Sequence, residues 1–190
     1  MSAIEWAAAA ITLLSVILSA KQNIWSWPTA IVGVALYIDV FWSARLYADM
    51  GLQFFFIIIS FYGWYEWLYG GKNATPLPVT RAPLRVHAIG TLITIAIAIA
   101  FGWFLHRTTD AALPYVDSTL AWFSVLAQWQ MARKYLENWV LWIAIDVGSI
   151  AMYLFKKLYV TAGLYAVFIV VCYLAWREWR ASMRAPSPVA

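Results

Sequence analysis

Apolar residues fall into seven long runs, separated by short segments that are richer in polar residues. Each run approaches the roughly 20 residues that an α-helix needs to cross a bilayer. The pattern therefore predicts an all-α membrane protein with seven transmembrane helices. The expected helices lie at about 4–20, 25–44, 51–69, 87–105, 115–132, 138–155 and 158–176.

Composition supports a membrane protein and argues against a soluble one. Of the 190 residues, 64% are hydrophobic and 12% are charged, with a mean hydropathy of +0.72, whereas soluble domains carry about 25% charged residues. The first run has Glu5 and no basic residue before it, and Lys21 follows it. This order favours an uncleaved helix over a secretory signal peptide.

The basic residues predict the orientation. Four of the 13 lysines and arginines are expected on the side of the N-terminus, and the other nine on the opposite side. The positive-inside rule then places the N-terminus outside and the C-terminus in the cytoplasm. The four on the N-terminal side are Arg45, Arg107, Lys156 and Lys157.

An internal repeat divides the chain. The segment 46–67, LYADMGLQFFFIIISFYGWYEW, aligns without gaps with the segment 158–179, LYVTAGLYAVFIVVCYLAWREW. We call this constant spacing, which pairs position 46 with position 158, the repeat offset. Scattered apolar matches would not place LY, GL and WxEW in register. We therefore predict one transmembrane domain over 1–190, with repeat 1 at about 4–69, a linking helix at about 87–105 and repeat 2 at about 115–179.

The repeat predicts a 3+1+3 arrangement of helices. Three helices end on the side opposite to where they began, and the linking helix returns the chain, so the two triplets run in parallel. Parallel repeats imply a pseudo-two-fold axis along the membrane normal, with the substrate between the repeats near the midplane.

The stretch 138–159, NWVLWIAIDVGSIAMYLFKKLY, carries the most specific signal for a binding site. It places Asp146 near the middle of a predicted membrane helix, where an acidic residue costs roughly 2.5–3.5 kcal/mol on insertion scales. Such residues usually face a bundle interior and mark a substrate or ion path. A helix puts two indoles, this carboxylate, a hydroxyl and a phenol on one face, which suits a flat, polar, cationic molecule. The face consists of Trp139, Trp142, Asp146, Ser149 and Tyr153.

Further candidate ligands follow from the repeat and from buried polarity. Buried amides need hydrogen-bond partners, which either neighbouring helices or a substrate can supply. Trp27 and Trp139 also lie where interfacial packing would explain a tryptophan, and Asn138 lies where helix capping is an adequate explanation. The additional candidates are Trp27, Tyr37, Gln53, Gln128, Asn138 and Tyr165.

Several function classes are disfavoured. The chain has no GxxxxGK[ST] loop, which argues against an ATPase within it. Its two histidines lie at opposite ends of the fourth predicted helix, and Cys172 is its only cysteine. We therefore expect no metal site, no cofactor, no catalytic residues and no enzymatic activity. The net charge of +4 does not indicate a nucleic-acid partner, because the basic residues are spread among short loops and termini.

Long segments of the chain resemble the PnuC-type transporter family. The resemblance is carried by AQWQMARKYLENWVLWIAIDVGSIAMYLFKKLYVTAGLYAVF and WREW in the second half, and by NIWSWPTAIVGVALY and ARLYADMGLQFFFIIISFYGWYEW in the first. It covers roughly 20–180. In this family the sixth helix carries a WxxxN or WxxxD element at the substrate, which corresponds to Trp142 and Asp146.

The resemblance implies a specific function. It implies a fold related to SWEET transporters, a bacterial inner-membrane location and a homotrimer. It also implies facilitated diffusion of nicotinamide riboside, a precursor in NAD biosynthesis, which a cytoplasmic kinase then traps by phosphorylation. Thiamine or another B vitamin is the alternative within the class, since thiamine also has a cationic ring. A membrane scaffold or assembly protein is the alternative from another class.

Overall fold

The computed structural model describes residues 3–43, 47–109, 112–155, 157 and 159–184. Within these residues the chain forms seven α-helices and one short 3₁₀ turn, η1 (Lys72–Ala74). The all-α class is therefore confirmed. The helices are α1 (Ala3–Ala20), α2 (Ser26–Ser43), α3 (Tyr47–Tyr69), α4 (Leu84–Thr108), α5 (Pro114–Ala132), α6 (Asn138–Phe155) and α7 (Tyr159–Ser182).

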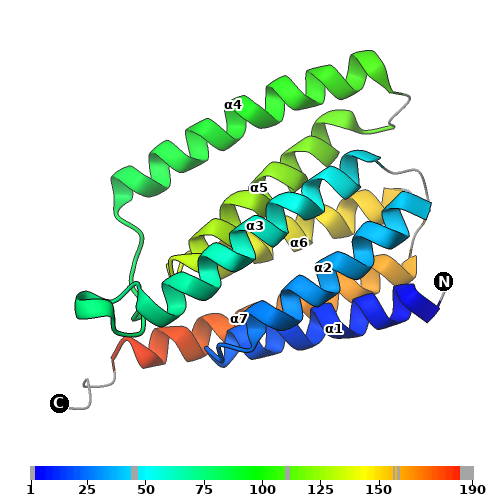
Figure 1. The fold of residues 1–190 in the computed structure, drawn as a ribbon. Coiled ribbons are helices and arrows are strands. Elements are labelled where there is room, and N and C mark those ends of the chain that lie inside the picture. Colours follow the sequence, from blue (N-terminus) through cyan, green and yellow to red (C-terminus); the bar gives the residue numbers. More distant parts are fainter. Residues whose placement is uncertain (1–2, 44–46, 110–111, 156, 158, 185–190) are drawn as a thin grey trace.

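Six of these helices form a closed ring, and α4 lies outside it. Along the chain α1 packs on α2, α2 on α3, α5 on α6 and α6 on α7, while α3–α5 and α1–α7 contacts close the ring. Helix α4 packs on α5 (Figure 1). That contact is close because Gly102 leaves room for the ring of Tyr115, and the Ser118 hydroxyl donates to the Ala98 carbonyl at 2.7 Å.

The helix bounds follow the repeat offset predicted from the sequence. Helices α2 and α6 are related by that offset at both ends, and each end of α1 and α3 lies within one residue of its counterpart in α5 and α7. The ring contacts are likewise paired, with α1–α2 matching α5–α6 and α3–α5 matching α7–α1. These regularities agree with two parallel triplets, and the 3+1+3 repeat itself stays a prediction.

The turns that join α1 to α2 and α5 to α6 have the same backbone. Each contains a residue with positive φ, Gln22 at 53° and Lys134 at 50°. The amide of the next residue donates to the carbonyl five residues back, at 2.9 Å in both turns. This is the Schellman pattern, which satisfies carbonyls at a helix C-terminus.

Four buried tryptophans pack together at one end of the ring, which we call the tryptophan end. The Trp27 and Trp67 rings are 5.3 Å apart and nearly perpendicular, and the Trp139 and Trp179 rings repeat this arrangement at 5.3 Å. The Trp67 and Trp179 rings, 5.8 Å apart, join the two pairs. Edge-to-face packing is the favourable geometry for aromatic pairs, so the cluster ties the two triplets together.

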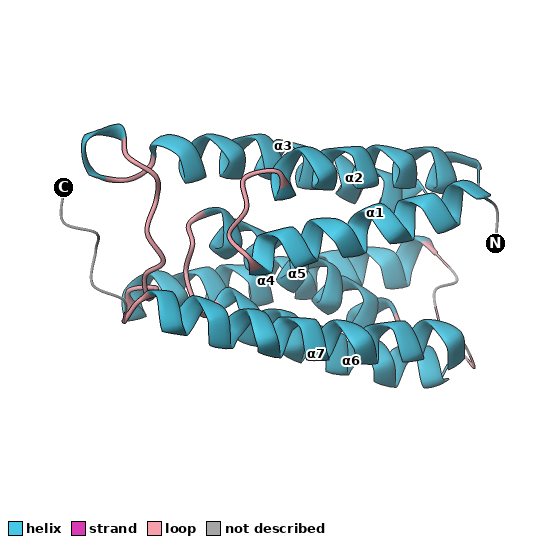
Figure 2. Ribbon diagram, turned by 90° about the horizontal axis from the view of Figure 1, so that it is seen from below, coloured by secondary structure: helices cyan, strands magenta, loops and turns pink. Residues whose placement is uncertain are grey.

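The linker between α3 and α4 runs back to the tryptophan end. Leu136 donates its amide to the Thr80 carbonyl at 2.9 Å, and the Ala82 amide donates to the Glu137 carboxylate at 2.8 Å. Leu77 packs against the tryptophan cluster. The linker 70–83 is therefore fixed to the α5–α6 turn. Figure 2 shows this linker as the loop that leaves the end of α3.

Three of the described helical segments are long and apolar enough to cross a membrane by length and composition: Leu84–Thr108, Asn138–Phe155 and Ala162–Ser182. A shorter apolar segment covers Trp6–Ala20. All seven predicted runs correspond to helices, but helices such as α5 (Pro114–Ala132) are less apolar because they contain serine, glutamine and tryptophan. Four residues used in the predictions on orientation and the repeat lie outside the described residues: Arg45, Leu46, Lys156 and Leu158.

Candidate functional site

The predicted face of α6 is turned toward the interior of the ring. Trp139, Asp146 and Ser149 are buried, and Asp146 is only 4% exposed. Val140 and Val147, which point away from this face, are more than half exposed. The helical spacing in the sequence therefore separated the inward residues of α6 from the outward ones correctly.

Asp146 lies in a small group of polar side chains contributed by three helices. The Cys172 thiol of α7 donates to Asp146 Oδ2 at 3.9 Å. The Tyr165 hydroxyl, also on α7, interacts electrostatically with Asp146 and with Tyr37 of α2. The ring of Tyr165 lies 5.2 Å from that of Tyr153. Three predicted ligands, Asp146, Tyr37 and Tyr165, thus lie near enough to interact electrostatically.

The thiol is a poor partner for a buried carboxylate. Hydrogen bonds from sulfur are weak, whereas leaving a buried charged group without good partners costs several kcal/mol. Among the described residues, Asp146 has no cationic partner within ion-pair distance. The carboxylate therefore has unused capacity to accept hydrogen bonds or to pair with a cation.

Several other buried polar atoms lack a hydrogen-bond partner among the described residues. Nearly all buried polar groups in native proteins are satisfied by protein or water, so each such atom is free to bind a water or a ligand. The indole N–H of Trp142, on the Asp146 face of α6, is one of them. The others within the ring helices are Nε1 of Trp27 and Trp139, Oγ of Ser26 and Ser60, Oδ1 of Asn138 and Oε1 of Gln130.

Trp27 and Trp139 have a clear packing function. Both are almost fully buried in the tryptophan cluster, at 1% and 0% exposed. The edge of Trp27 lies against Gly63 of α3, where a Cβ atom would come within 2.3 Å of the ring. Their structural role, which was one of the two interpretations of the sequence, is therefore evident. Whether their indole N–H groups also bind a ligand stays a prediction.

The remaining predicted ligands lie on several helices. Asn138 starts α6 and donates from Nδ2 to the Tyr135 carbonyl at 2.6 Å. An N-cap accepts through its side-chain oxygen, and Oδ1 of Asn138 has no partner among the described residues, so this bond is not a cap. Gln53 is buried on α3 and is engaged within the protein. Gln128 is half-buried on α5. A role of Gln53 and Gln128 as ligands stays a prediction.

A small polar residue at the site, Cys172 of α7, was missed from the sequence, as was its counterpart Ser60 on α3. Cys172 contacts Asp146, and Ser60 is fully buried on α3. The repeat offset pairs Ser60 with Cys172. Aligning the polar positions of the third and seventh helices, in addition to those of the second and sixth, would have identified both.

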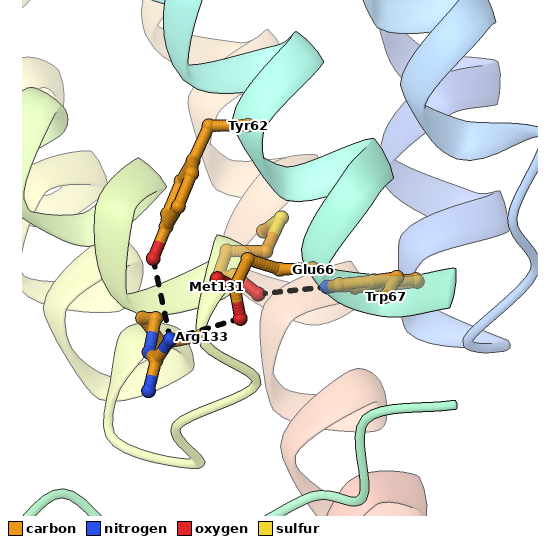
Figure 3. Close-up of polar contacts among 5 residues, drawn as sticks. All are labelled: Tyr62, Glu66, Trp67, Met131 and Arg133. Carbon is orange, nitrogen blue, oxygen red and sulfur yellow. Dashed lines mark hydrogen bonds and ion pairs between the residues drawn. The ribbon is translucent and has the colours of Figure 1, made fainter. Parts of the chain in front are cut away.

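Polar contacts close the tryptophan end between the two triplets. Figure 3 shows Trp67 Nε1 of α3 donating to the Met131 carbonyl of α5 at 3.1 Å, beside the ion pair of Glu66 with Arg133 at 2.8 Å. The Arg133 guanidinium also donates to the Tyr62 hydroxyl at 3.3 Å (Figure 3). These contacts connect the end of α3 to the end of α5.

A matching contact connects the other pair of helices. Trp179 Nε1 of α7 donates to the carbonyls of Ser19 and Ala20 in α1, both at 3.1 Å. The repeat offset pairs Trp179 with Trp67 and Ser19 with Met131, so the two indole–carbonyl bonds are equivalent. Each bond joins a helix of one triplet to a helix of the other at this end.

Lys134 lies where the two halves meet. Its ammonium group stands 4.5 Å from the centroid of the Trp67 ring and donates to the Gln22 side chain at 3.4 Å. Gln22 is the counterpart of Lys134 at the repeat offset. Burial, which disfavours the charged ammonium group, lowers the pKa of Lys134 to about 8.

Known proteins with similar sequences are transporters of B vitamins. The chain is 27% identical over 197 residues to the nicotinamide riboside transporter PnuC of Escherichia coli, a match that covers 90% of this chain and 82% of the relative. It is 23% identical over 177 residues to the riboflavin/roseoflavin transporter RibM of Streptomyces davaonensis, covering 88% and 79%.

The fold matches a solved structure of the same group. The crystal structure of the vitamin B3 transporter PnuC aligns with a TM-score of 0.72 at 21% identity, covering 93% of this chain and 80% of that one. A family model described as nicotinamide mononucleotide transporter matches residues 2–181. These matches confirm the PnuC-type resemblance and support a multi-pass inner-membrane transporter instead of an enzyme. The chain belongs to the nicotinamide mononucleotide transporter family.

Proposed function

We propose that the protein is a passive transporter of nicotinamide riboside across the bacterial inner membrane. The observation that carries this proposal is the buried Asp146, which accepts a hydrogen bond from a thiol, on the same face of α6 as the unpartnered indole N–H of Trp142. Nicotinamide riboside combines a cationic pyridinium ring with ribose hydroxyls. The carboxylate and the indole match those two features.

In the proposed complex each group has a distinct role. The Trp142 indole stacks on the pyridinium ring, a cation–π contact worth roughly 2 kcal/mol when water is excluded. Asp146 pairs with the cation or accepts hydrogen bonds from the ribose. The Tyr165 hydroxyl interacts electrostatically with Asp146 and with Tyr37, and the two tyrosine hydroxyls supply the other polar groups for the substrate.

Transport in this proposal is a rocking of the two triplets around the site. The structure has the tryptophan end closed by the Trp67–Met131 and Trp179–Ser19 hydrogen bonds. With the N-terminus outside, the tryptophan end faces the cytoplasm, and these bonds form the inner gate. No ion gradient drives the cycle. Phosphorylation of the released riboside by a cytoplasmic kinase prevents its return, and the functional unit is a homotrimer.

Two other vitamins remain as substrates to be distinguished. Thiamine has a cationic thiazolium ring, so the same carboxylate and indole suit it. Riboflavin is a candidate because the chain is similar to the transporter RibM. The riboflavin ring system is neutral, however, and would leave Asp146 without a charged partner. A scaffold protein, the alternative from another class, is disfavoured by the match to a transporter family over residues 2–181.

The test is uptake into liposomes that contain the purified protein and no ion gradient. Radiolabelled nicotinamide riboside, thiamine and riboflavin are offered separately, with and without a riboside kinase and ATP inside. We expect nicotinamide riboside to equilibrate across the membrane and to accumulate only when it is phosphorylated inside. Accumulation without the kinase would contradict passive transport, and uptake of only thiamine or riboflavin would contradict the proposed substrate.

A further inference from the structure

The last turns of α7 form a basic groove that the proposed transport cycle does not use. It is lined by Tyr173, Trp176, Arg177, Arg180, Ala181 and Arg184, and we call it the arginine groove. These residues recur at helical spacing, so they occupy one side of α7. The groove opens on the outside of the bundle and is separate from the face of α6 that carries Asp146.

The three guanidinium groups have no acidic partner in the part of the chain that the structure describes. Among the described residues Arg177, Arg180 and Arg184 make no ion pair and no side-chain hydrogen bond, in contrast to Arg133, which pairs with Glu66. Glu178, the neighbouring acid on α7, is exposed and makes no ion pair with a described residue. The groove therefore carries an uncompensated positive charge.

Aromatic side chains order the groove on its apolar side. The Arg180 guanidinium lies 5.0 Å from the centroid of the Trp176 ring, a cation–π contact that holds the arginine in place. Trp176 stacks on Tyr173, with the ring centroids 6.3 Å apart. The planar guanidinium is thus held with its N–H donors available, and arginine is well suited to binding phosphate.

The arginine groove lies at the level along α7 where the headgroup of a membrane lipid is expected. The apolar segment Ala162–Ser182 is long enough to cross a bilayer, and tyrosine and tryptophan concentrate at membrane interfaces. Earlier on this side of α7, Val170 and Leu174 are more than half exposed. The same side of the helix therefore presents first an apolar track, then an aromatic pair, then three cations.

We infer that the arginine groove binds an anionic phospholipid of the membrane. The headgroup phosphate lies among the guanidinium groups of Arg177, Arg180 and Arg184, and the acyl chains lie along Val170 and Leu174. Basic clusters next to a membrane helix attract anionic lipids, and each cation adds to the attraction. A zwitterionic lipid carries the same phosphate but lacks the net charge, so the groove discriminates against it.

The test measures lipid binding to the purified detergent-solubilised protein by native mass spectrometry. Phosphatidylglycerol is compared with phosphatidylcholine of the same chain length. We expect phosphatidylglycerol to bind about tenfold or more tightly, and we expect the triple variant Arg177→Gln/Arg180→Gln/Arg184→Gln to lose this preference.

A matched control removes the same charge elsewhere. The variant Lys72→Gln/Arg81→Gln/Arg85→Gln alters three exposed residues before and at the start of α4 and should keep the wild-type preference. Three results would overturn the inference: equal binding of the two lipids by the wild type, an unchanged preference in the α7 triple variant, or full displacement of the lipid by millimolar inorganic phosphate. That last result would assign the groove to a free anion. Substrate uptake by each variant reports separately on the transport proposal.

Discussion

The contact between Gly63 and Trp27 allows a sharp test of how the tryptophan end is packed. A Cβ atom at position 63 would lie 2.3 Å from Cη2, 2.4 Å from Cζ2 and 2.7 Å from Cζ3 of the Trp27 ring. The indole cannot move freely, because it is 1% exposed and packs edge-to-face on Trp67. Gly63→Ala must therefore displace the ring or separate α2 from α3.

The magnitude follows from two opposing terms. Overpacking a well-packed core costs about 1–3 kcal/mol, while replacing glycine by alanine within a helix contributes about 1 kcal/mol in the opposite direction. For Gly63→Ala we expect a net loss of up to about 2 kcal/mol in the free energy of unfolding. Gly51, on the same helix, has no atom of a described residue within 4 Å of the position that an alanine methyl group would occupy, so Gly51→Ala should be neutral or stabilising.

The assay is thermal unfolding in detergent of wild type, Gly63→Ala and Gly51→Ala, prepared identically. The second half of the chain offers a comparison at the equivalent position. There the repeat offset pairs Gly63 with Ala175, which is fully buried, and Trp27 with Trp139. Equal midpoints for Gly63→Ala and Gly51→Ala would refute the close packing of Trp27 on α3.

Two further predictions concern charged groups at the tryptophan end. Glu66→Gln removes the ion pair with the partly exposed Arg133 and should lower the free energy of unfolding by roughly 1 kcal/mol or less, an effect that weakens at high salt; a midpoint equal to that of the wild type at low salt would show that the pair contributes nothing. Lys134 has a folded-state pKa of about 8, below its ordinary value of 10.5, because it is buried. The unfolded chain therefore binds the proton more tightly, and stability should rise between about pH 8 and pH 10.5. Lys134→Met should reduce this rise in a pH series of thermal unfolding, and an identical pH dependence in the variant would contradict the assignment.

The arrangement of helices could be largely predicted from the sequence, because it depends on periodic features. Runs of apolar residues located all seven helices, and the repeat offset anticipated that α2 and α6 have equivalent bounds. The spacing on α6 also placed Asp146 and Ser149 inside and left Val147 outside. These features are local, so a single sequence carries them.

Contacts between helices could not be predicted in the same way. The bond between Cys172 and Asp146 depends on the rotation of α7 against α6, which periodicity does not specify. The attachment of the linker at Thr80 to the α5–α6 turn depends on backbone hydrogen bonds between segments distant in sequence. Trp27 was predicted equally as ligand and as packing residue, since a tryptophan at a helix start is compatible with both, and its contact with Gly63 shows the packing role.

The role of Asp146 is the central claim, and direct binding tests it. Titration calorimetry of nicotinamide riboside with the purified protein should show binding by the wild type. Removing a hydrogen bond to a charged group costs about 1.5–3 kcal/mol, so Asp146→Ala should weaken binding by about 10- to 150-fold, and Trp142→Ala should weaken it as well. Asp39→Ala, which alters an exposed acid on α2, should bind as the wild type does. Unchanged affinity in both Asp146→Ala and Trp142→Ala would contradict the account.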